Sequence, residues 1–290
     1  MSMKWISPKL SFSFLLLVSS FAGAESQQLE QQLRFEQFEL HREFGVKTER
    51  QIPMLRDLAE LYLSRGQNHR AVIESRFAYQ LSEGFDDSSM IEAARHANLL
   101  SATGRQQEAY KRITKSLDSS DLSPLERQQL LISLGDLGLH HSGYLGRSIQ
   151  ALDEASVLSS THDHMTHPYI NLRLADLNLI AGNVKAAHAI YQQLWRDYPD
   201  NRSDWFNKPR LLKAGGQQKI LYNRQQSVIG VQFLVSKNGR AKHAKVRDRI
   251  SSQHRASINH WLSKAVFRPQ ITDGLPQGEP TSLQSLLTAG

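Results

Sequence analysis

Cysteine is absent from this 290-residue sequence, and so are the short motifs that carry well-known chemistry. Without cysteine there is no disulfide bond, thiolate metal ligand, cysteine nucleophile or cysteine-linked lipid anchor. No glycine-rich phosphate loop, nucleophile elbow or H-E-x-x-H sequence occurs either. The sequence therefore predicts a protein that is not an enzyme and that binds no cofactor. An enzyme stays open as an alternative, because active sites built on loops often have no readable motif.

Long apolar runs are also absent, apart from Leu10–Val18 near the N-terminus. This run is too short to cross a bilayer, which takes about 20 apolar residues. Lys4 and Lys9 precede it and Ala22-Gly23-Ala24 follows, which is the order typical of a secretory signal peptide. We expect residues 1–24 to be a signal peptide, with an uncleaved anchor as the alternative. The mature chain would then have no transmembrane span and would be exported, most simply to the periplasm.

Acidic residues are scarce in one part of the chain. Residues 205–290 contain 14 lysines and arginines against 3 acidic residues, a net charge of +11, whereas residues 25–204 contain 19 against 25, a net charge of −6. This asymmetry predicts two domains. A basic domain alone would suggest nucleic acid. Because an exported protein rarely meets nucleic acid, we expect an anionic partner in the cell envelope instead, or charges that only keep the domain soluble.

An internal repeat occupies residues 52–200. The glycines Gly66, Gly104, Gly143 and Gly182 follow one another at intervals of 38, 39 and 39 residues. A small residue lies five positions after each glycine, and another lies seven positions before three of them; these are Ala71, Ala109, Ser148, Ala187, Ala59, Ala97 and Ala175. The pattern predicts helix pairs that turn at a glycine and pack closely at small side chains. Residues 26–44 predict one further amphipathic helix that caps the array.

These units resemble tetratricopeptide repeats. The last unit carries the signature residues of that family at Leu174, Ala175, Gly182, Ala187, Tyr191 and Pro199, and the first carries Leu58, Ala59, Tyr62, Gly66, Ala71 and Ala78. The period of about 38 exceeds the 34 residues of the family, which implies longer loops between units. The resemblance implies a helical-repeat solenoid over residues 25–200, with a concave face that binds a peptide or a partner helix.

The remaining residues predict a small α+β domain. Residues 201–227 contain Pro209 and Gly215-Gly216 and read as a linker or lead-in. A strand follows, with Ile229, Val231, Phe233 and Val235 on one face, and then Asn238-Gly239 predicts a two-residue hairpin turn. The returning strand would bury Ala244, Val246 and Ile250. Ser251 or Ser252 would cap a helix that buries Ile258, Trp261, Leu262, Ala265 and Val266 and ends at Arg268-Pro269.

This domain resembles the C-terminal domain of TonB, the periplasmic protein that couples inner-membrane energy to outer-membrane transporters. The matching residues are Gly239, Phe267, Pro269, Gly278 and Pro280. The resemblance implies a ββαβ fold over residues 228–290 that binds proteins by strand addition along its last strand, residues 281–287. The departures are Ala265 in place of a tryptophan, Tyr222-Asn223 in place of Tyr-Pro, and a weakly apolar last strand.

Two surfaces of this domain are candidate partner-binding sites. One is a basic stripe on the exposed side of the returning strand, where His243 is followed by Lys245, Arg247 and Arg249; its simpler interpretation is a solvated face of a half-buried sheet. The other is the last strand. The candidate residues are Lys245, Arg247, Arg249, Thr281, Leu283, Ser285 and Leu287.

One histidine-rich run could bind a metal ion. His162, His164 and His167 surround Asp163 in the loop expected between the third and fourth helix pairs, and imidazoles at this density could hold Zn²⁺ or Cu²⁺. A site needs three or four converging ligands, and polar residues are also expected in such a loop. We therefore predict no metal site and keep metal binding as an alternative.

The sequence as a whole predicts an α+β protein with an N-terminal all-α helical-repeat solenoid and a small ββαβ domain. We expect a periplasmic adaptor that binds protein partners in the envelope, among them an outer-membrane transporter or components of a TonB-type uptake system. The alternative is an envelope structural or assembly protein whose basic C-terminal domain contacts anionic cell wall or membrane. Salt separates the two, because charge-driven binding weakens at a few hundred millimolar salt.

Overall fold

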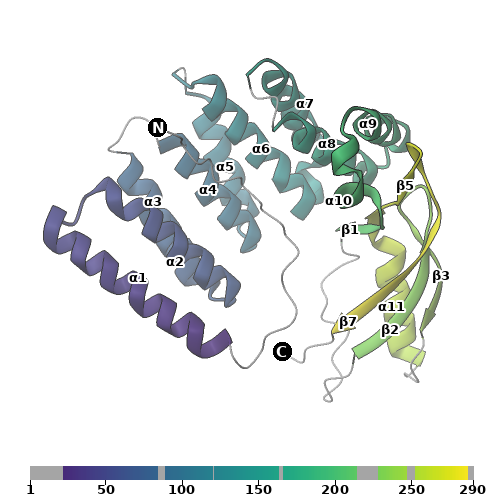
Figure 1. Cartoon of the computed structure of the whole chain (residues 1–290), viewed down its shortest axis with the longest axis horizontal. Helices are drawn as coiled ribbons and strands as arrows, with labels where there is room; N and C mark the ends of the chain where they lie inside the picture. Colours follow the sequence, from purple (N-terminus) through teal and green to yellow (C-terminus); the bar gives the residue numbers. More distant parts are fainter. Residues whose placement is uncertain are drawn as a thin grey trace. The chain divides into compact units, whose positions relative to one another are not determined.

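The computed structural model describes residues 22–83, 89–119, 121–162, 166–213, 228–246 and 252–286. It is an α+β protein, mainly helical, with small antiparallel sheets in its C-terminal part (Figure 1). The chain divides into two compact units, Met1–Asp86 and Asp87–Gly290. The second unit contains both the later helices and the sheets, so the division does not fall where the composition changes.

The first unit contains α1 (Ala22–Phe44), η1 (Glu49–Gln51), α2 (Ile52–Ser64) and α3 (Asn68–Ser82). The amphipathic helix expected over residues 26–44 is confirmed as part of α1, and the expected signal-cleavage residues 22–24 form its first turn. Of its expected apolar stripe, Leu33 is buried while Leu29 is 45% exposed. Most of the buried apolar residues of this unit belong to α2 and α3. Helix α1 packs on these two helices but contributes few buried apolar side chains of its own.

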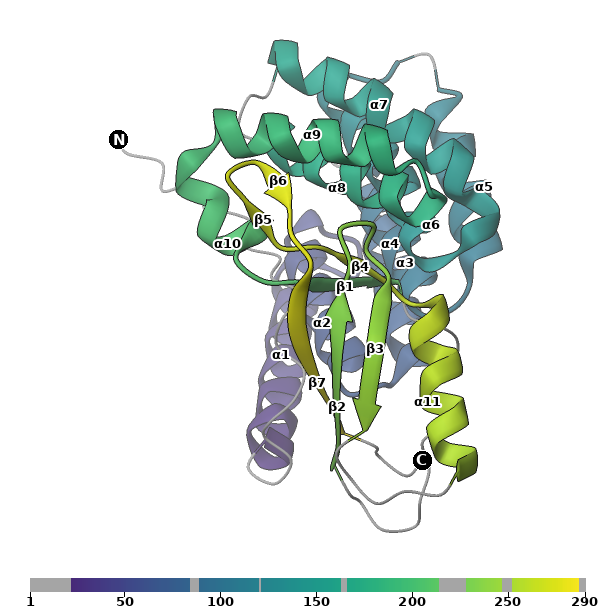
Figure 2. The same cartoon turned by 90° about the vertical axis from the view of Figure 1, so that its right-hand side faces the viewer.

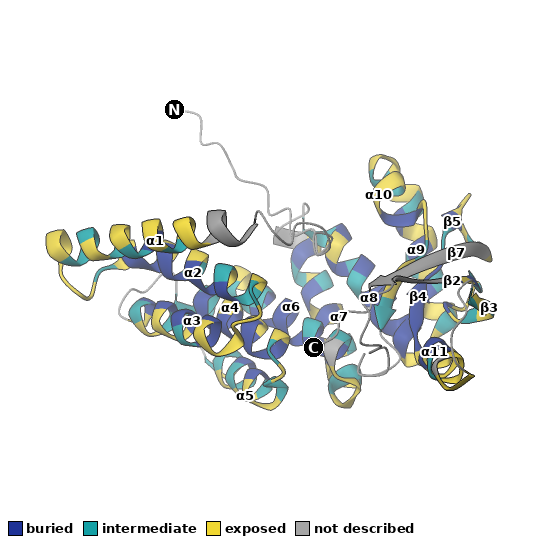
Figure 3. Cartoon of the chain, turned by 90° about the horizontal axis from the view of Figure 1, so that it is seen from below, coloured by how far each residue is buried: buried dark blue, intermediate teal, exposed yellow. Residues whose placement is uncertain are grey.

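The second unit begins with six helices, α4 (Ser89–Ala102), α5 (Gln106–Leu117), α6 (Pro124–His140), α7 (Leu145–His162), α8 (His167–Ala181) and α9 (Val184–Asp197). Helices α4 and α5, α6 and α7, and α8 and α9 pack as consecutive pairs, and α2 and α3 form a pair of the same kind in the first unit. The helix pairs predicted from the glycine spacing are therefore confirmed in the described residues. In Figure 3 buried residues gather on α6 and α8, where neighbouring helices meet.

Three of the four predicted turn glycines have the left-handed backbone that the pattern requires. Gly66, Gly104 and Gly182 have φ of 70°, 87° and 87°. At Gly182 the chain closes with a hydrogen bond from the amide of Asn183 to the carbonyl of Asn178 at 2.8 Å. The prediction for Gly143 is wrong, because this residue lies in a 3₁₀ turn, η2 (Ser142–Tyr144), whose start is capped by the His141 side chain.

Small residues bring the paired helices together as predicted. The seven predicted small residues are all buried, and Ala71, Ala97, Ala109, Ser148, Ala175 and Ala187 have no exposed surface. In the third helix pair, α6 and α7, a glycine also permits close contact between the two helices. A Cβ atom on Gly138 would lie 2.7 Å from Cβ of Ser148, which real Cβ atoms do not tolerate. The α6–α7 contact thus also depends on small residues, with Ser148 at the predicted position and Gly138 outside the predicted pattern.

Residues 201–227 are more than a linker. They include α10 (Arg202–Phe206), whose Trp205 and Phe206 are buried, and β1 (Arg210–Lys213). Strand β1 pairs antiparallel with β4 (Val266–Arg268), a strand that the sequence analysis did not predict. The predicted helix end at Arg268-Pro269 is wrong for the same reason. Helix α11 (Ser252–Lys264) ends earlier, because Val266 and Phe267 are buried in β4 instead of continuing the helix.

The main sheet has three antiparallel strands in the order β3 (Ala241–Val246), β2 (Val228–Val235), β7 (Glu279–Leu286). Between α11 and β7 the chain forms a short hairpin of β5 (Ile271–Thr272) and β6 (Leu275–Pro276). Val231, Phe233 and Val235 of β2 pack with the buried face of α11, as predicted from their alternation. Figure 2 shows β2 between its two neighbours.

The hairpin turn differs from the predicted two-residue type. Only Gly239 has positive φ, at 72°, and the amide of Ser236 donates to the carbonyl of Arg240 at 2.9 Å. The loop therefore consists of residues 237–239, which is the three-residue class that ends in a left-handed glycine. On β3 the register shifts between its pairings with Gln232 and Leu234, and His243 has φ of 54° there. This bulge moves His243 out of the regular alternation.

The turn also docks the sheet onto the helices of the same unit. A Cβ atom on Gly239 would lie 2.3 Å from the carbonyl oxygen of Phe267 and 3.0 Å from the side chain of Leu179 in α8. The amide of Phe267 donates to the carbonyl of Gly239 at 2.8 Å, and Nε2 of His188 in α9 lies 2.9 Å from the carbonyl of Lys237. The hairpin, β4, α8 and α9 thus form one packed structure.

Candidate functional site

Strand β7 is one of the two outer strands of the main sheet in the part of the chain that is described, and β3 is the other. One side of β7 pairs with β2 from Glu279 to Leu286, and no described strand pairs with its other side. An outer strand offers a row of backbone N–H and C=O groups for pairing with another chain. The last strand predicted from the sequence is therefore present, and it has a free edge.

The hairpin hydrogen bond decides which residues of β7 face that free edge. In a strand the N–H and C=O of one residue point to the same side, and those of the next residue to the other side. Because Ser236 bonds Arg240, even-numbered residues of β2 such as Leu234 face β3, and odd-numbered residues such as Phe233 face β7. Phe233 lies opposite Thr281. The odd-numbered residues of β7 therefore bond to β2, and the even-numbered ones face outward.

Pro280 supports this assignment independently. Proline has no backbone N–H, so within a sheet it occupies positions whose N–H side faces away from a partner strand. Pro280 lies opposite Leu234 in β7 and is even-numbered. The two arguments agree that Ser282 and Gln284 present complete pairs of backbone groups at the free edge, while Pro280 presents only its carbonyl.

The structure places the predicted last-strand residues in the inner half of this pattern. Thr281, Leu283 and Ser285 lie opposite Phe233, Val231 and Ile229 and bond to β2. Leu287 lies outside the described residues. The outward-facing Ser282 and Gln284 were not among the predicted site residues. The signal that identifies them was already in the sequence, because Pro280 fixes which residues face outward.

The basic stripe is described only in part. Lys245 is exposed on β3 opposite Gln232, as predicted, and Lys242 is exposed opposite Leu234. Arg247, Arg249 and Ile250 lie outside the described residues, whereas Ala244 and Val246 are partly buried against the core, as expected. Two exposed lysines of the basic stripe's face, Lys242 and Lys245, are therefore described. They are three residues apart in sequence, and the bulge lies between them.

A buried ion pair joins the sheet region to the helices. Nε of Arg268 in β4 donates to Oδ1 of Asp176 in α8 at 2.8 Å, and its Nη2 donates to Oδ2. The remaining Nη1 donates to the carbonyl of Trp205 at 3.1 Å, and the hydroxyl of Tyr191 donates to Oδ1 of Asp176 at 2.6 Å. The side chains of Arg268 and Asp176 are 3% and 8% exposed, so water hardly screens the pair.

This environment shifts three ionisation equilibria. Burial raises the pKa of Tyr191 well above its ordinary value, and the charge of Asp176 raises it further. Burial opposes the charge of Arg268, but the attraction and hydrogen bonds of Asp176 outweigh it and raise the pKa of Arg268. Burial, followed by repulsion from Arg268, lowers the pKa of Arg210, which lies opposite Arg268 in the β1–β4 pair. Arg268 therefore stays charged, and Asp176 is the carboxylate that balances it.

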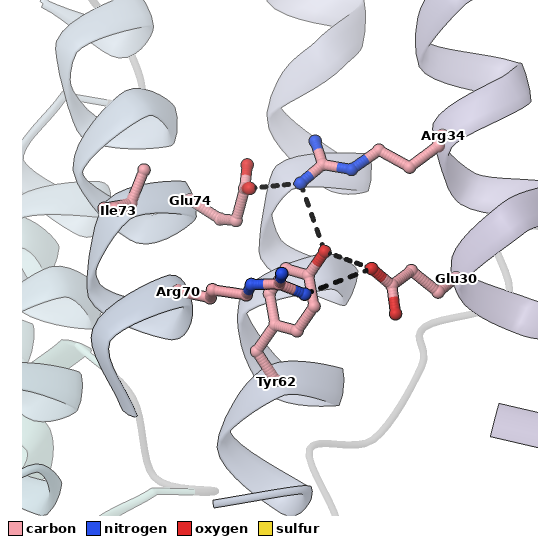
Figure 4. Close-up of a pocket in the computed structure, with 6 residues that line it drawn as sticks. All are labelled: Glu30, Arg34, Tyr62, Arg70, Ile73 and Glu74. Carbon is pink, nitrogen blue, oxygen red and sulfur yellow. Dashed lines mark hydrogen bonds and ion pairs between the residues drawn. The ribbon is translucent and has the colours of Figure 1, made fainter. Parts of the chain in front are cut away.

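A second group of charged residues lies in the first unit, between α1 and the α2–α3 pair. Glu30 and Arg34 of α1 reach toward Tyr62 of α2 and toward Arg70 and Glu74 of α3 (Figure 4). The hydroxyl of Tyr62 donates to Glu30 at 2.6 Å and accepts from Arg34 at 3.2 Å. These residues and Ile73 line a cavity of about 360 Å³.

The histidine-rich run is only partly described, since residues 163–165 lie outside the described ranges. His167 at the start of α8 has its Nδ1 2.8 Å from Oγ of Ser159 and its Nε2 2.9 Å from Nδ2 of Asn171. Both ring nitrogens thus have protein partners, and the contact with Ser159 connects α7 to α8. Within the described ranges, no group of three histidine or acidic side chains is arranged to hold a metal ion.

Two further observations bear on the class of protein. None of the described helices combines the length and the apolar character that a membrane crossing requires. No protein-family model matches the chain, and no curated protein is similar to it.

Proposed function

We propose that this chain is a periplasmic adaptor that captures an extended segment of a partner protein along the free edge of β7. The observation that carries the proposal is the outward-facing row of backbone groups at Ser282 and Gln284. Strand addition to such an edge draws its affinity from main-chain hydrogen bonds, and side chains of the added strand supply specificity. The absence of known catalytic motifs and the lack of a described metal cluster are compatible with a binding role but do not carry it.

The resemblances extend the proposal. The signature residues of the last helix pair are typical of tetratricopeptide repeats, which bind peptides or helices of other proteins. The order of elements from β2 to β7 is similar to that of the TonB C-terminal domain, which binds outer-membrane transporters. On this basis we place the adaptor in a TonB-type uptake system, with one partner on the helices and one on the sheet.

The test compares two neighbouring residues of β7. Gln284→Pro removes an outward N–H and leaves the bonds to β2 in place, so it should weaken partner capture by the worth of one hydrogen bond, about 0.5–1.5 kcal/mol, and leave the fold intact. Ser285→Pro removes an inward N–H, so it should break the β2–β7 pairing and lower the stability of the sheet. Capture is measured by crosslinking in intact cells followed by affinity purification, and folding by urea denaturation of the purified variants.

The alternative is electrostatic contact with anionic cell wall or membrane through Lys242 and Lys245. Changing both to glutamate reverses the charge of this face and leaves the β7 edge unchanged. Strand addition predicts that capture survives this change and survives salt of a few hundred millimolar. If the double glutamate variant loses its partner while Gln284→Pro binds it with unchanged affinity, strand addition is wrong and the electrostatic contact replaces it.

A further inference from the structure

The cavity between α1 and the α2–α3 pair has the composition of a small anion site. Figure 4 shows Glu30 and Arg34 of α1 on one side, Arg70 and Glu74 of α3 on the other, and Tyr62 between them. Its volume of about 360 Å³ is at the low end of the range of ligand pockets, about 300–1,000 Å³. The Tyr62 ring, Ile73 and the two arginines Arg34 and Arg70 give it an apolar base and a cationic rim.

The two carboxylates at this cavity are already neutralised by the protein. Glu30 accepts from Tyr62 and forms an ion pair with Arg65, and Glu74 forms an ion pair with Arg34. The hydrogen bond from Tyr62 lowers the pKa of Glu30; burial opposes this, and Arg65 lowers the pKa further. Glu30 therefore stays ionised near neutral pH, and neither carboxylate needs an external cation.

Arg70 is much less satisfied. Among the described residues its guanidinium bonds Gln67 at 3.3 Å and lies 3.8 Å from Glu30, which is beyond hydrogen-bonding distance. Its side chain is 60% exposed and lies over the Tyr62 ring, 5.5 Å from the centroid. Arg34 lies over the same ring at 5.9 Å and is 40% exposed. Two guanidinium groups therefore share one aromatic ring, and Arg70 has N–H groups available for a further acceptor.

We propose that this cavity binds a carboxylate of a partner peptide, held by Arg70 with help from Arg34, while the adjoining apolar part of the peptide contacts Ile73. Three arginines, Arg34, Arg65 and Arg70, oppose the two glutamates, so the site has one positive charge in excess. This excess suits a monoanion. The single excess charge would leave one negative charge of a phosphate dianion uncompensated, and arginine matches the planar carboxylate by two parallel hydrogen bonds.

The carboxylate has two possible sources, the side chain of an acidic residue or the C-terminus of a chain. Three short peptides separate them: acetyl-Leu-Leu-Leu with a free C-terminus, the same peptide as an amide, and acetyl-Leu-Glu-Leu amide. Each is titrated into the full mature chain while amide shifts of α2 and α3 are followed by NMR. We expect the free acid or the glutamate peptide to bind, and the neutral amide to bind at least about tenfold more weakly, which corresponds to about 1.4 kcal/mol.

Arg70→Gln removes one positive charge from the cavity and should weaken carboxylate binding at least about fivefold. Arg70→Lys keeps this charge and should retain part of the binding. Arg76→Gln is the matched control, because Arg76 is an exposed arginine on the same helix and does not line the cavity. It should leave binding unchanged. Both side chains are exposed, so neither change is expected to unfold the chain, and circular dichroism checks this.

The proposal is overturned if the neutral amide binds as well as the two carboxylate peptides, if no peptide produces a saturable shift, or if Arg70→Gln and Arg76→Gln behave alike. Tighter binding of inorganic phosphate than of the carboxylate peptides would show that the ligand class is wrong. This inference does not rest on strand addition at β7. Gln284→Pro leaves the first unit unchanged, so it should not affect these titrations, and the two proposals can fail separately.

Discussion

The buried ion pair between Asp176 and Arg268 makes the strongest prediction about how the sheet is held on the helices. Asp176→Leu leaves Arg268 buried and charged, with the carbonyl of Trp205 and the hydroxyl of Tyr191 near it and no carboxylate to balance it. A guanidinium cannot lose its proton in a protein, so the charge stays uncompensated. Breaking a buried pair by removing one partner costs about 3–5 kcal/mol, and we expect Asp176→Leu to lie in that range.

Arg268→Met should cost less than Asp176→Leu. Asp176 keeps the hydrogen bond that the hydroxyl of Tyr191 donates to it, and hydrogen bonds to an ionised group are stronger than those between neutral groups. The double variant removes both charges and fills the space with apolar groups, which is often neutral or stabilising for a buried pair. We therefore expect the double variant to be more stable than Asp176→Leu alone, with a coupling free energy of at least about 2 kcal/mol.

The assay is urea denaturation followed by tryptophan fluorescence, since Trp205 accepts a hydrogen bond from Arg268. With a urea dependence of about 1–3 kcal/mol per molar, a loss of 3 kcal/mol or more moves the midpoint by at least about 1 M. The control is Glu154→Leu, which breaks an Arg127–Glu154 pair of 2.7 Å whose side chains are 43% and 45% exposed; it should cost less than about 1 kcal/mol. Additive effects of the two single changes at 176 and 268 would refute the reasoning.

Three other perturbations test the fold. Gly239→Ala should destabilise the chain by more than about 2 kcal/mol in urea, because it adds a Cβ 2.3 Å from a carbonyl oxygen at a position of positive φ, while Gly146→Ala, in a helix with open space around it, should be neutral or stabilising. Ala187→Leu should overpack the α8–α9 contact at a cost of about 1–3 kcal/mol, whereas Gln193→Leu on the exposed side of α9 should leave the melting curve unchanged. The lowered pKa of Glu30 adds stability above the ordinary value of 4.5 that is lost as the pH falls through the lower folded value. The protection factors of the α1 amides, which are their intrinsic exchange rates divided by the observed ones, should therefore fall below pH 4.5, and Glu30→Gln should remove this pH dependence; protection factors that do not change with pH would contradict it.

The elements that the sequence predicts correctly are those whose structural cause lies within a short stretch of the chain. Helix pairs follow from a glycine with a left-handed backbone and from small residues a few positions away, as at Gly182 and Ala187, and these features act within one hairpin of the chain. Strand β2 follows from alternating apolar residues. At Gly143 the same spacing gave a wrong prediction. The His141 side chain caps a 3₁₀ turn there, and this turn needs no residue with a left-handed backbone.

The failures concern contacts between residues far apart in the sequence. Val266 continues the apolar spacing of α11, and nothing local distinguishes a longer helix from a strand. The pairing of β4 with β1, more than fifty residues earlier, determines that Val266 belongs to a strand. Arg268 looked like a residue at a helix end until its partner Asp176 was known. The predicted last strand is present as β7, whereas the outward-facing Ser282 and Gln284 were missed, although Pro280 already marked the even-numbered residues of this strand as the outward-facing ones.

Pro280 also affects which strand β7 selects as a neighbour. If two copies of this chain paired along their β7 edges with Ser282 of one opposite Gln284 of the other, Pro280 of each copy would face Leu286 of its neighbour, and the ladder would lack two N–H donors. A foreign strand without proline in the same place would lack one. Each such bond contributes about 0.5–1.5 kcal/mol. One proline therefore biases the edge toward a heterologous strand and away from self-association, at the cost of a single bond in the intended complex.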